Sequence, residues 1–327
     1  MRIVSLSPSA TEILCALGLE SSLVGVSHEC DWPISVRDLP RLTRSLLPET
    51  QIDEDGEILE LSALEIDNAV REAVASGESL FTIDIELFRE LKPDLLVTQG
   101  LCNVCAVHHK TALIASEALD KAAGAMVLDL SPTTLAEVLE TFRQIGTATQ
   151  RDAEAESLIA KTQNRWDAVR EKTQTIGELP RTLLLEWPEP SFSAGHWNPE
   201  LLQIAGGMLA PWDIVGKPSR VLDWTEVLEF NPEYIVLIAC GFDAYRSLDE
   251  AWPLSELPGW YDLPAVRNGD CYAADGNAFF NRPGPRLADS AEILATILRP
   301  EVFTDMLPPY SVQRFPDEML VRIEDTT

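Results

Sequence analysis

The pattern of hydrophobic and polar positions predicts one long helix at residues 149–174, near the middle of the chain. The stretch contains no Gly or Pro, Thr149 and Asp152 have the spacing of a capping box, and apolar positions recur at helical spacing. Those positions are Ala155, Leu158, Ile159, Thr162, Trp166 and Val169. At 1.5 Å per residue the helix would be about 37 Å long, the diameter of a small domain. A helix of this length can join two lobes. The alternative is a coiled-coil arm or a helix packed inside one large domain, although no heptad pattern is sustained.

Strand-like apolar runs alternate with helix-like segments on both sides of this helix. Before it, strands are predicted at residues 3–6, 24–26, 94–98 and 126–128, and helices at 7–18, 86–91, 110–123 and 131–146. After it, strands are predicted at 182–185, 234–238 and 271–274, and helices at 198–205, 226–230 and 285–298. Residues 49–65 contain seven acidic and no basic residues, and we expect them to form a solvated excursion.

This alternation predicts an α/β fold with two lobes, each a mostly parallel sheet flanked by helices with right-handed crossovers. The expected parts are an N-terminal lobe (1–148), a connecting helix (149–176) and a C-terminal lobe (177–327). A sequence echo relates the lobes: residues 86–94 (ELFRELKPD) and 226–233 (EVLEFNPE) both place a helix and a proline before a strand. The lobes therefore look like two versions of one α/β unit.

The composition is that of a soluble globular protein, with 46% hydrophobic and 24% charged residues. The net charge of −28 argues against nucleic acid and anionic membrane surfaces as partners. No apolar run is long enough to span a membrane. Met1 and Arg2 lead straight into a strand without the features of a signal peptide, so we expect a cytoplasmic protein, or a periplasmic one if a signal has been removed.

Ligands of open α/β sheets bind beyond the carboxyl ends of the strands, and this rule selects nearly all of the unusual residues of both lobes. If the lobes face each other, these residues line one cleft. The candidates for ligand binding are Ser7, His28, Glu29 and Trp32 in the first lobe and Glu186, Trp187, His196, Trp197, Cys240, Phe279, Phe280, Arg282 and Arg286 in the second. The aromatic rings lie in Pro- and Gly-rich loops and suit a large planar ligand, although core packing is the usual role of such rings. The two arginines could bind a carboxylate or amide of a ligand, or form internal ion pairs.

His28, Cys30, Cys102 and Cys105 form a candidate metal site. His28 and Cys30 are two residues apart, and Cys102 and Cys105 have the CxxC spacing of a metal knuckle. Six cysteines in a chain of this length predict free thiols or metal ligands rather than a disulfide scaffold. Thiolate and imidazole suit zinc, iron or cobalt, but the CxxC also fits a thiol redox pair, and buried structural thiols are the third alternative. His196 could be an axial ligand or a loop residue at the surface.

The sequence contains no GxSxG, HExxH, GxxxxGK or GxGxxG motif, and it places no nucleophile beside a base. We therefore expect a binding protein rather than an enzyme. A thiol-dependent enzyme that uses the CxxC is the alternative.

Five features carry a resemblance to a known family: SLSPSATE at 5–12 with Gly18, VGVS at 24–27, LKPDL at 91–95, the glycine pair at 206–207, and Pro232. These features resemble the periplasmic substrate-binding proteins of ABC importers for cobalamin and ferric siderophores, the class with one rigid connecting helix. The similarity covers nearly the whole chain. Through residues 28–33, 102–105 and 280–286, the chain is most similar to a branch labelled cobalamin-binding protein, many of whose members lack export signals.

The resemblance implies a corrinoid (cobalamin-like) or related metal tetrapyrrole bound in a cleft between two lobes, with little hinge motion. The expected ligand is therefore cobalamin or a related corrinoid, and a transition metal ion is a further candidate. Binding of a metal ion or siderophore complex through the Cys and His residues is the alternative function. In exported members a Glu on each lobe docks onto the ABC permease; Glu86 matches the first, whereas Thr225 occupies the second position and Glu226 follows it. The Cys and His set differs from what exported cobalamin binders use, which implies that this branch holds cobalt or another metal directly.

Overall fold

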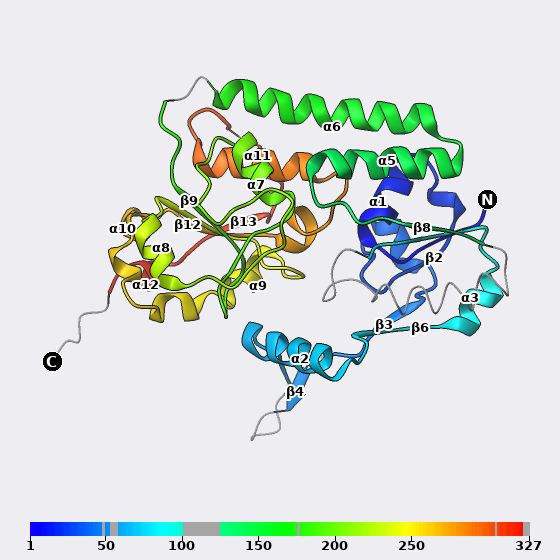
Figure 1. The fold of residues 1–327 in the computed structure, drawn as a ribbon, viewed down its shortest axis with the longest axis horizontal. Coiled ribbons are helices and arrows are strands. Elements are labelled where there is room, and N and C mark those ends of the chain that lie inside the picture. Colours follow the sequence, from blue (N-terminus) through cyan, green and yellow to red (C-terminus); the bar gives the residue numbers. More distant parts are fainter. Residues whose placement is uncertain (48–49, 53–57, 101–124, 175–176, 305, 323–327) are drawn as a thin grey trace. The chain divides into compact units, whose positions relative to one another are not determined.

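The computed structural model describes residues 1–47, 50–52, 58–100, 125–174, 177–304 and 306–322. They form two compact units, which we describe separately (Figure 1). The first unit comprises Met1–Pro132 and Ala136–Ala160, and the second comprises Thr133–Leu135 and Lys161–Thr327. Among the described residues, no helix is both long enough and apolar enough to cross a bilayer.

The first unit is built on a parallel sheet of four strands in the order β2-β1-β7-β8. The strands are β1 (Ile3–Ser5), β2 (Leu23–Val26), β7 (Leu95–Thr98) and β8 (Met126–Asp129). Ile3 lies opposite Leu95, and Leu95 lies opposite Met126. The central strands β1 and β7 are buried along their whole length, which is why they form continuous apolar runs in the sequence.

Helices α1 (Pro8–Ala16), α3 (Ile85–Leu91) and α5 (Leu135–Thr149) lie where the hydrophobic pattern predicts them. A proline begins α1, where its missing N–H costs nothing, and Gly18, with a φ of 75°, follows the helix end. Ile13 of α1 and Phe142 of α5 are buried, as the apolar faces of these helices predict. Two short 3₁₀ segments, η1 (Glu20–Ser22) and η2 (Ile34–Asp38), flank β2. The helix predicted at residues 110–123 lies outside the described residues.

The segment from residue 43 to residue 83, which includes the acidic stretch 49–65, contains more regular structure than its sequence predicts. Strands β3 (Thr43–Ser45) and β6 (Phe81–Ile83) pair antiparallel, as do β4 (Thr50–Ile52) and β5 (Ile58–Glu60), and α2 (Ala63–Ser76) follows. A capping box between Ser62 and Glu65 begins α2. The solvated excursion predicted at residues 49–65 contains β4 and β5, and α2 begins at its end and buries only Ala63 and Val70.

The long helix is α6 (Asp152–Thr173), and the division between the two units falls within it, after Ala160. The predicted capping box at its start is wrong. Thr149 is the last residue of α5, and its Oγ1 donates to Ile145 O at 2.7 Å, while Asp152 Oδ1 accepts from Thr147 Oγ1 at 2.7 Å. That the helix is a rigid connector, separate from the lobes, stays a prediction.

The second unit is built on a sheet of five strands in the order β10-β9-β11-β12-β13. The strands are β9 (Thr182–Trp187), β10 (Phe192–Ser193), β11 (Tyr234–Leu237), β12 (Cys271–Ala274) and β13 (Val312–Arg314). The three central strands are parallel and the two edge strands are antiparallel to them. The predicted α/β fold with mostly parallel sheets is therefore confirmed.

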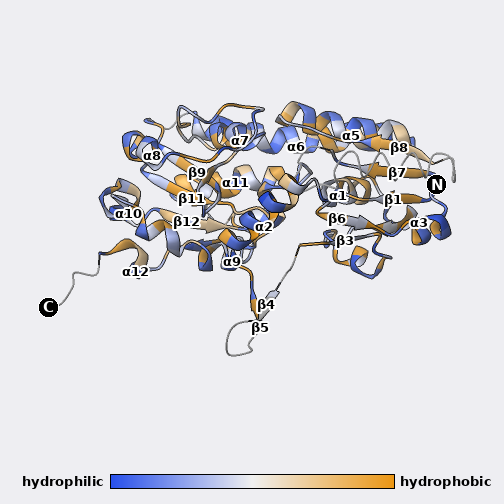
Figure 2. Ribbon diagram, turned by 60° about the horizontal axis from the view of Figure 1, so that its bottom comes forward, coloured by the Kyte–Doolittle hydropathy of each residue, from blue (hydrophilic) through white to orange (hydrophobic). Residues whose placement is uncertain are grey.

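Several helices accompany the second sheet, and α11 packs against α7. The α-helices are α7 (Asn198–Ile204), α8 (Trp224–Phe230), α9 (Ala244–Asp249), α10 (Pro264–Asn268), α11 (Leu287–Leu298) and α12 (Asp317–Leu320). Shorter 3₁₀ segments are η3 (Trp252–Glu256) and η4 (Trp260–Asp262). Hydrophobic positions concentrate in β9, β11 and α11, which form the core of this unit (Figure 2).

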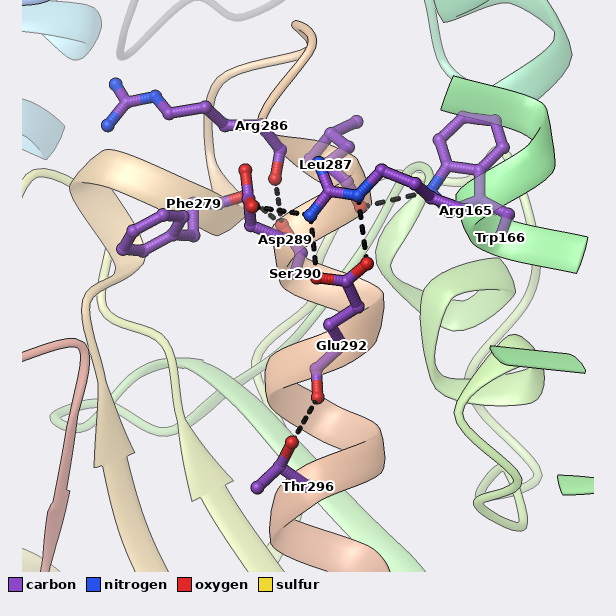
Figure 3. A network of polar contacts seen from close by, with 9 residues as sticks. All are labelled: Arg165, Trp166, Phe279, Arg286, Leu287, Asp289, Ser290, Glu292 and Thr296. Carbon is purple, nitrogen blue, oxygen red and sulfur yellow. Dashed lines mark hydrogen bonds and ion pairs between the residues drawn. The ribbon is translucent and has the colours of Figure 1, made fainter. Parts of the chain in front are cut away.

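Within the second unit, α6 is joined to α11 by a polar network (Figure 3). Arg165 Nε donates to Glu292 Oε1 at 2.9 Å, and Arg165 Nη2 donates to Asp289 Oδ1 at 2.6 Å. On the next residue of α6, the indole Nε1 of Trp166 donates to Leu287 O at 3.1 Å. The network therefore fixes the first turns of α11, which directly follow candidate site residues.

The sequence echo corresponds to a repeated structure at the amino ends of both sheets. In the first unit, Arg2 N donates to Asp94 Oδ2 at 2.7 Å and Arg2 Nε donates to Leu91 O at 2.7 Å. In the second unit, Arg181 N donates to Glu233 Oε2 at 3.0 Å and Arg181 Nε donates to Asn231 O at 2.8 Å. Helices α3 and α8 both end in a left-handed residue that precedes a proline. The two units thus share one α/β arrangement.

Candidate functional site

Three connections come together at the carboxyl edge of the second sheet. They are the last residues of β9 with Glu186, the connection after β11 with Cys240, and the connection after β12 with residues 275–286. Backbone hydrogen bonds join them: Cys240 N donates to Glu186 O at 3.2 Å, and Asn277 N donates to Phe242 O at 3.0 Å. The structure thus brings together the candidate residues that the strand-end rule selected in this unit.

Glu186 holds two loops in place at this edge. Its Oε2 accepts from Gly195 N at 3.2 Å, and its Oε1 accepts from Ser219 Oγ at 3.2 Å. Burial raises the pKa of Glu186, and these two hydrogen bonds oppose the rise. A Cβ atom at Gly195 would lie 2.2 Å from Ser219 N, so only glycine fits there. The carboxylate therefore supports the site by fastening the loops beside it.

Two rings and a guanidinium group lie together at the ends of β9 and β11, with the ring planes inclined by 39°. The rings of Trp187 and Phe242 lie 5.0 Å apart, and the Arg246 guanidinium lies 4.4 Å from the centre of the Phe242 ring. Trp187 is partly exposed, whereas Phe242 is buried behind it. Asp243 begins α9, with Oδ1 accepting from Arg246 N at 2.8 Å, which fixes the start of the helix that carries the guanidinium. Such an arrangement can stack a planar group and donate hydrogen bonds to its polar substituents.

Sequence reasoning missed Phe242 and Arg246. Both follow Cys240 and Gly241 within a few residues, and α9, which carries Arg246, is too short for its period to be recognised. Their position after a strand could have identified them. The strand-end rule selected Cys240, and it applies equally to the residues that directly follow Cys240.

The connection after β12 forms a π-helix, Gly276–Phe280. Asp275 Oδ1 accepts from Ala278 N at 2.7 Å, and Asn281 Nδ2 donates to Ile238 O at 2.9 Å. A Cβ atom at Gly276 would lie 2.2 Å from Ala239 O, so the turn packs directly on the end of β11. Burial raises the pKa of Asp275. Helical segments of this kind often occur at functional sites, and this one carries the partly exposed ring of Phe279.

The two candidate arginines have different surroundings. Arg286 lies over the Phe279 ring, 5.6 Å from its centre, and is partly exposed. Arg282 is only 6% exposed, and its Nη2 donates to Asn277 Oδ1 at 2.8 Å. Ser290 Oγ donates to Phe279 O, which links this ring to the first turn of α11 (Figure 3). Arg286 is therefore the more accessible of the two arginines, and Arg282 shapes the loop.

Trp197 and Phe280, predicted to contact a ligand, are packed inside the second unit. Both rings are buried, and Trp197 Nε1 donates to Phe280 O at 2.8 Å. His196, beside them, adopts a φ of 55° and donates its N–H to Lys217 O at 2.6 Å. Burial lowers the pKa of His196. The two buried rings therefore support the site from behind.

At the carboxyl edge of the first sheet, Ser7 belongs to a buried hydroxyl cluster. Ser7 Oγ and Ser9 Oγ donate to Gln99 Oε1 at 2.8 and 3.0 Å, and the two hydroxyls are 2.8 Å apart. The cluster joins the start of α1 to the end of β7. Gln99 Oε1 accepts from both hydroxyls, so the evident role of the cluster is to hold this edge together.

His28 lies after β2 and contacts Thr43, the first residue of β3. Its backbone N–H donates to Thr43 Oγ1 at 2.9 Å, and its Nδ1 lies 2.6 Å from the same oxygen, which indicates that the hydroxyl donates to Nδ1. The ring Nε2 lies 3.2 Å from Glu29 Oε1. Trp32, a few residues on, is 48% exposed. Of the first-unit candidates, Glu29 and Trp32 are thus the more accessible.

The proposed metal set is only partly described. Cys102 and Cys105 lie outside the described residues. Cys30 is fully buried, with its Sγ 3.1 Å from both Thr11 Oγ1 and Ser27 Oγ, which favours the structural-thiol alternative for this residue. No group of three or more His, Cys, Asp or Glu side chains that could hold a metal ion occurs in the part of the chain that the structure describes.

These features define a binding protein of two α/β units whose polar and aromatic side chains gather at the carboxyl edges of the sheets. Residues 3–278 match the model of the periplasmic binding protein family, and the chain belongs to that family. It is 24% identical to the uncharacterized ABC transporter substrate-binding lipoprotein YvrC of Bacillus subtilis, over 93% of this chain and 82% of the relative. It is 26% identical to the vitamin B12-binding protein of Vibrio cholerae, over 91% of this chain and 89% of the relative.

Among solved structures, the fold is similar to that of a periplasmic heme-binding protein from Pseudomonas aeruginosa, with a TM-score of 0.64, 19% identity and coverage of 92% and 93% of the two chains. The predicted family and the prediction of a small-molecule binding protein rather than an enzyme are therefore confirmed. The predicted cytoplasmic location has no support, because the family is one of periplasmic proteins and one relative is a lipoprotein.

Proposed function

We propose that this protein binds a metal tetrapyrrole, with a cobalamin-like corrinoid as the first candidate. The observation that carries the proposal is the pairing of rings with guanidinium groups at the carboxyl edge of the second sheet: Trp187 and Phe242 with Arg246, and Phe279 with Arg286. A macrocycle offers a wide conjugated face for stacking, and its rim carries amides or carboxylates that accept hydrogen bonds from arginine.

The comparisons support this class of ligand at a coarser level. One relative is named for vitamin B12, and structures of similar fold are named for heme. Corrinoid amides and heme propionates are both acceptors for Arg246 and Arg286, so the arginines favour a tetrapyrrole without separating the two. The corrinoid comes first because the motifs at residues 28–33 and 280–286 resemble the cobalamin-binding branch.

An absorption and calorimetric titration with cyanocobalamin and with hemin tests the proposal. We expect saturable one-to-one binding of the corrinoid, and a Trp187→Leu variant that binds about tenfold more weakly, because a stacked aromatic ring contributes roughly 1–2 kcal/mol. Trp252→Leu is the matched control, since Trp252 is exposed on η3 of the same unit and outside the site. Absence of binding to both ligands would contradict the proposal.

We further propose that the protein delivers its ligand to an ABC importer, as the name of the Bacillus relative suggests. Glu86, the second residue of α3, has a side chain that is 80% exposed and contacts only its helix neighbour Arg89 among its described ion pairs. In α8 the second residue is Thr225, and Glu226, the third, pairs with Arg220 at 2.8 Å. We therefore expect Glu86→Ala to reduce copurification with a permease more than Glu226→Ala does. An equal reduction of copurification in the two variants would contradict this.

A further inference from the structure

Two tyrosines outside the candidate set extend the aromatic surface of the second unit. Tyr245 is on α9 next to Arg246, and Tyr310 precedes β13. Their ring centres are 6.4 Å apart, and the ring planes are inclined by 41°. Tyr245 is 49% exposed and Tyr310 76% exposed. The pair is therefore accessible to a ligand from solvent.

The tyrosine pair belongs to the same sheet edge as the proposed site. Since β13 is antiparallel to β12, the start of β13 lies beside the end of β12, with Val312 opposite Ala274. Asp275 N donates to Ser311 O at 2.8 Å, which joins the turn that carries Tyr310 to the π-helical loop. Rings thus occur along this edge from β9, through the connection after β11, to β13, in the order of the strands.

The backbone at Tyr310 is held in a conformation that disfavours a large residue. Its φ is 63°, in the left-handed region that glycine and asparagine adopt more readily. Ser311 fixes the turn, because its N–H and its Oγ both donate to Pro308 O, at 3.2 and 2.7 Å. Glycine would adopt this turn with less strain than tyrosine, so the turn does not explain why a phenol ring occurs at this position.

We propose that Tyr245 and Tyr310 form a second aromatic subsite, which binds a planar heteroaromatic group that the ligand carries outside its macrocycle. The inference rests on the proposed function, in which Trp187 and Phe279 meet the macrocycle itself. A complete corrinoid carries such a group, a benzimidazole base on a nucleotide loop, whereas cobinamide has the same macrocycle and lacks the base. Two exposed phenol rings supply faces on which a base can stack. The ligand class that this subsite selects is a corrinoid with its base attached.

Calorimetric titrations of the full chain with cyanocobalamin and with dicyanocobinamide test the inference. We expect the wild type to bind cyanocobalamin at least about fivefold more tightly, because stacking of one base contributes roughly 1–3 kcal/mol. Tyr245→Leu and Tyr310→Leu should lose this preference and keep the affinity for dicyanocobinamide. Tyr310→Phe, which keeps the ring, should retain the preference, and Trp252→Leu should leave both affinities unchanged. Circular dichroism and thermal unfolding establish that each variant is folded.

The outcomes separate this inference from the proposed function. Equal affinity of the wild type for the two corrinoids would overturn the subsite while leaving the macrocycle site intact. A loss of affinity for both corrinoids by the same factor in the tyrosine variants would likewise overturn the subsite. Binding of hemin without either corrinoid would overturn the subsite and retain a tetrapyrrole-binding function. Failure to bind hemin and both corrinoids would overturn the proposed function together with the subsite.

Discussion

Replacement of Arg165 by methionine tests how strongly α6 is joined to α11 in the second unit. The guanidinium bonds Asp289 and Glu292, and all three side chains are partly withdrawn from solvent. Burial opposes the positive charge of Arg165, but its hydrogen bond to Glu292 raises the pKa well above the ordinary value, so the group stays charged. Exposed ion pairs contribute about 0–1 kcal/mol and loss of one partner from a buried pair costs about 3–5 kcal/mol. Because the Arg165 side chain is 37% exposed, we place Arg165→Met between these limits, at about 1–2 kcal/mol of unfolding free energy.

The assay is denaturant unfolding followed by tryptophan fluorescence, to which Trp166 contributes because its indole is hydrogen-bonded to Leu287 O in the same network. Methionine preserves most of the aliphatic stem, so packing changes little. Arg143→Met is the control: Arg143 pairs with two glutamates in the first unit and lies fully at the surface, so its loss should have little effect. In a background of Asp289→Asn and Glu292→Gln, Arg165→Met should cost almost nothing further. Full additivity in that background would refute the reasoning.

Two further predictions concern single residues of the second unit. Burial raises the pKa of Asp213 from 3.8 to about 7; the folded state then holds the proton more tightly than the unfolded state between these values, so stability should fall as pH rises from about 4 to 7. Asp213→Asn should remove this dependence of stability on pH, and at pH 8 its free energy of unfolding should exceed that of the wild type by at most about 4 kcal/mol. Thermal unfolding of both proteins across this pH range is the measurement, and parallel pH profiles would contradict the prediction. Gly276→Ala should destabilise the protein by about 1–3 kcal/mol, because its Cβ would lie 2.2 Å from Ala239 O. Gly177→Ala, where a Cβ meets no atom within 4 Å, is the control, and equal unfolding midpoints would contradict the clash.

The fold could be predicted from the sequence where one face of each element is buried. Strands β1, β7, β9 and β11 are continuous apolar runs, and α5 has a clear helical period with its apolar face in the core. Prediction failed where burial is slight. Helix α2 is largely exposed, with only Ala63 and Val70 buried, and α9 has only six residues. Thr149 and Asp152 have the spacing of a capping box but do not form one, because the Thr149 hydroxyl donates to Ile145 O within α5.

The candidate site could be located from the sequence but not resolved into roles. Position at the end of a strand is a local property, so the rule could select Trp187 and Phe279, which lie at the ends of β9 and β12. Whether a ring is core or surface depends on partners far away in the chain. Trp197 is buried through its bond to Phe280, which lies 83 residues further on, and no local pattern encodes that contact.

The comparison of the two units indicates where function was added to a common fold. At the amino ends of both sheets an arginine, an acidic residue and a helix end make the same set of hydrogen bonds, through Arg2 in one unit and Arg181 in the other. These bonds close the polar groups at the helix ends and serve folding alone. Among the described residues the carboxyl edges differ, with a hydroxyl cluster around Ser7 in one and rings with guanidinium groups around Phe242 in the other. A difference of this kind between two copies of one unit is expected if the edges, and not the sheets, carry the recognition of the ligand.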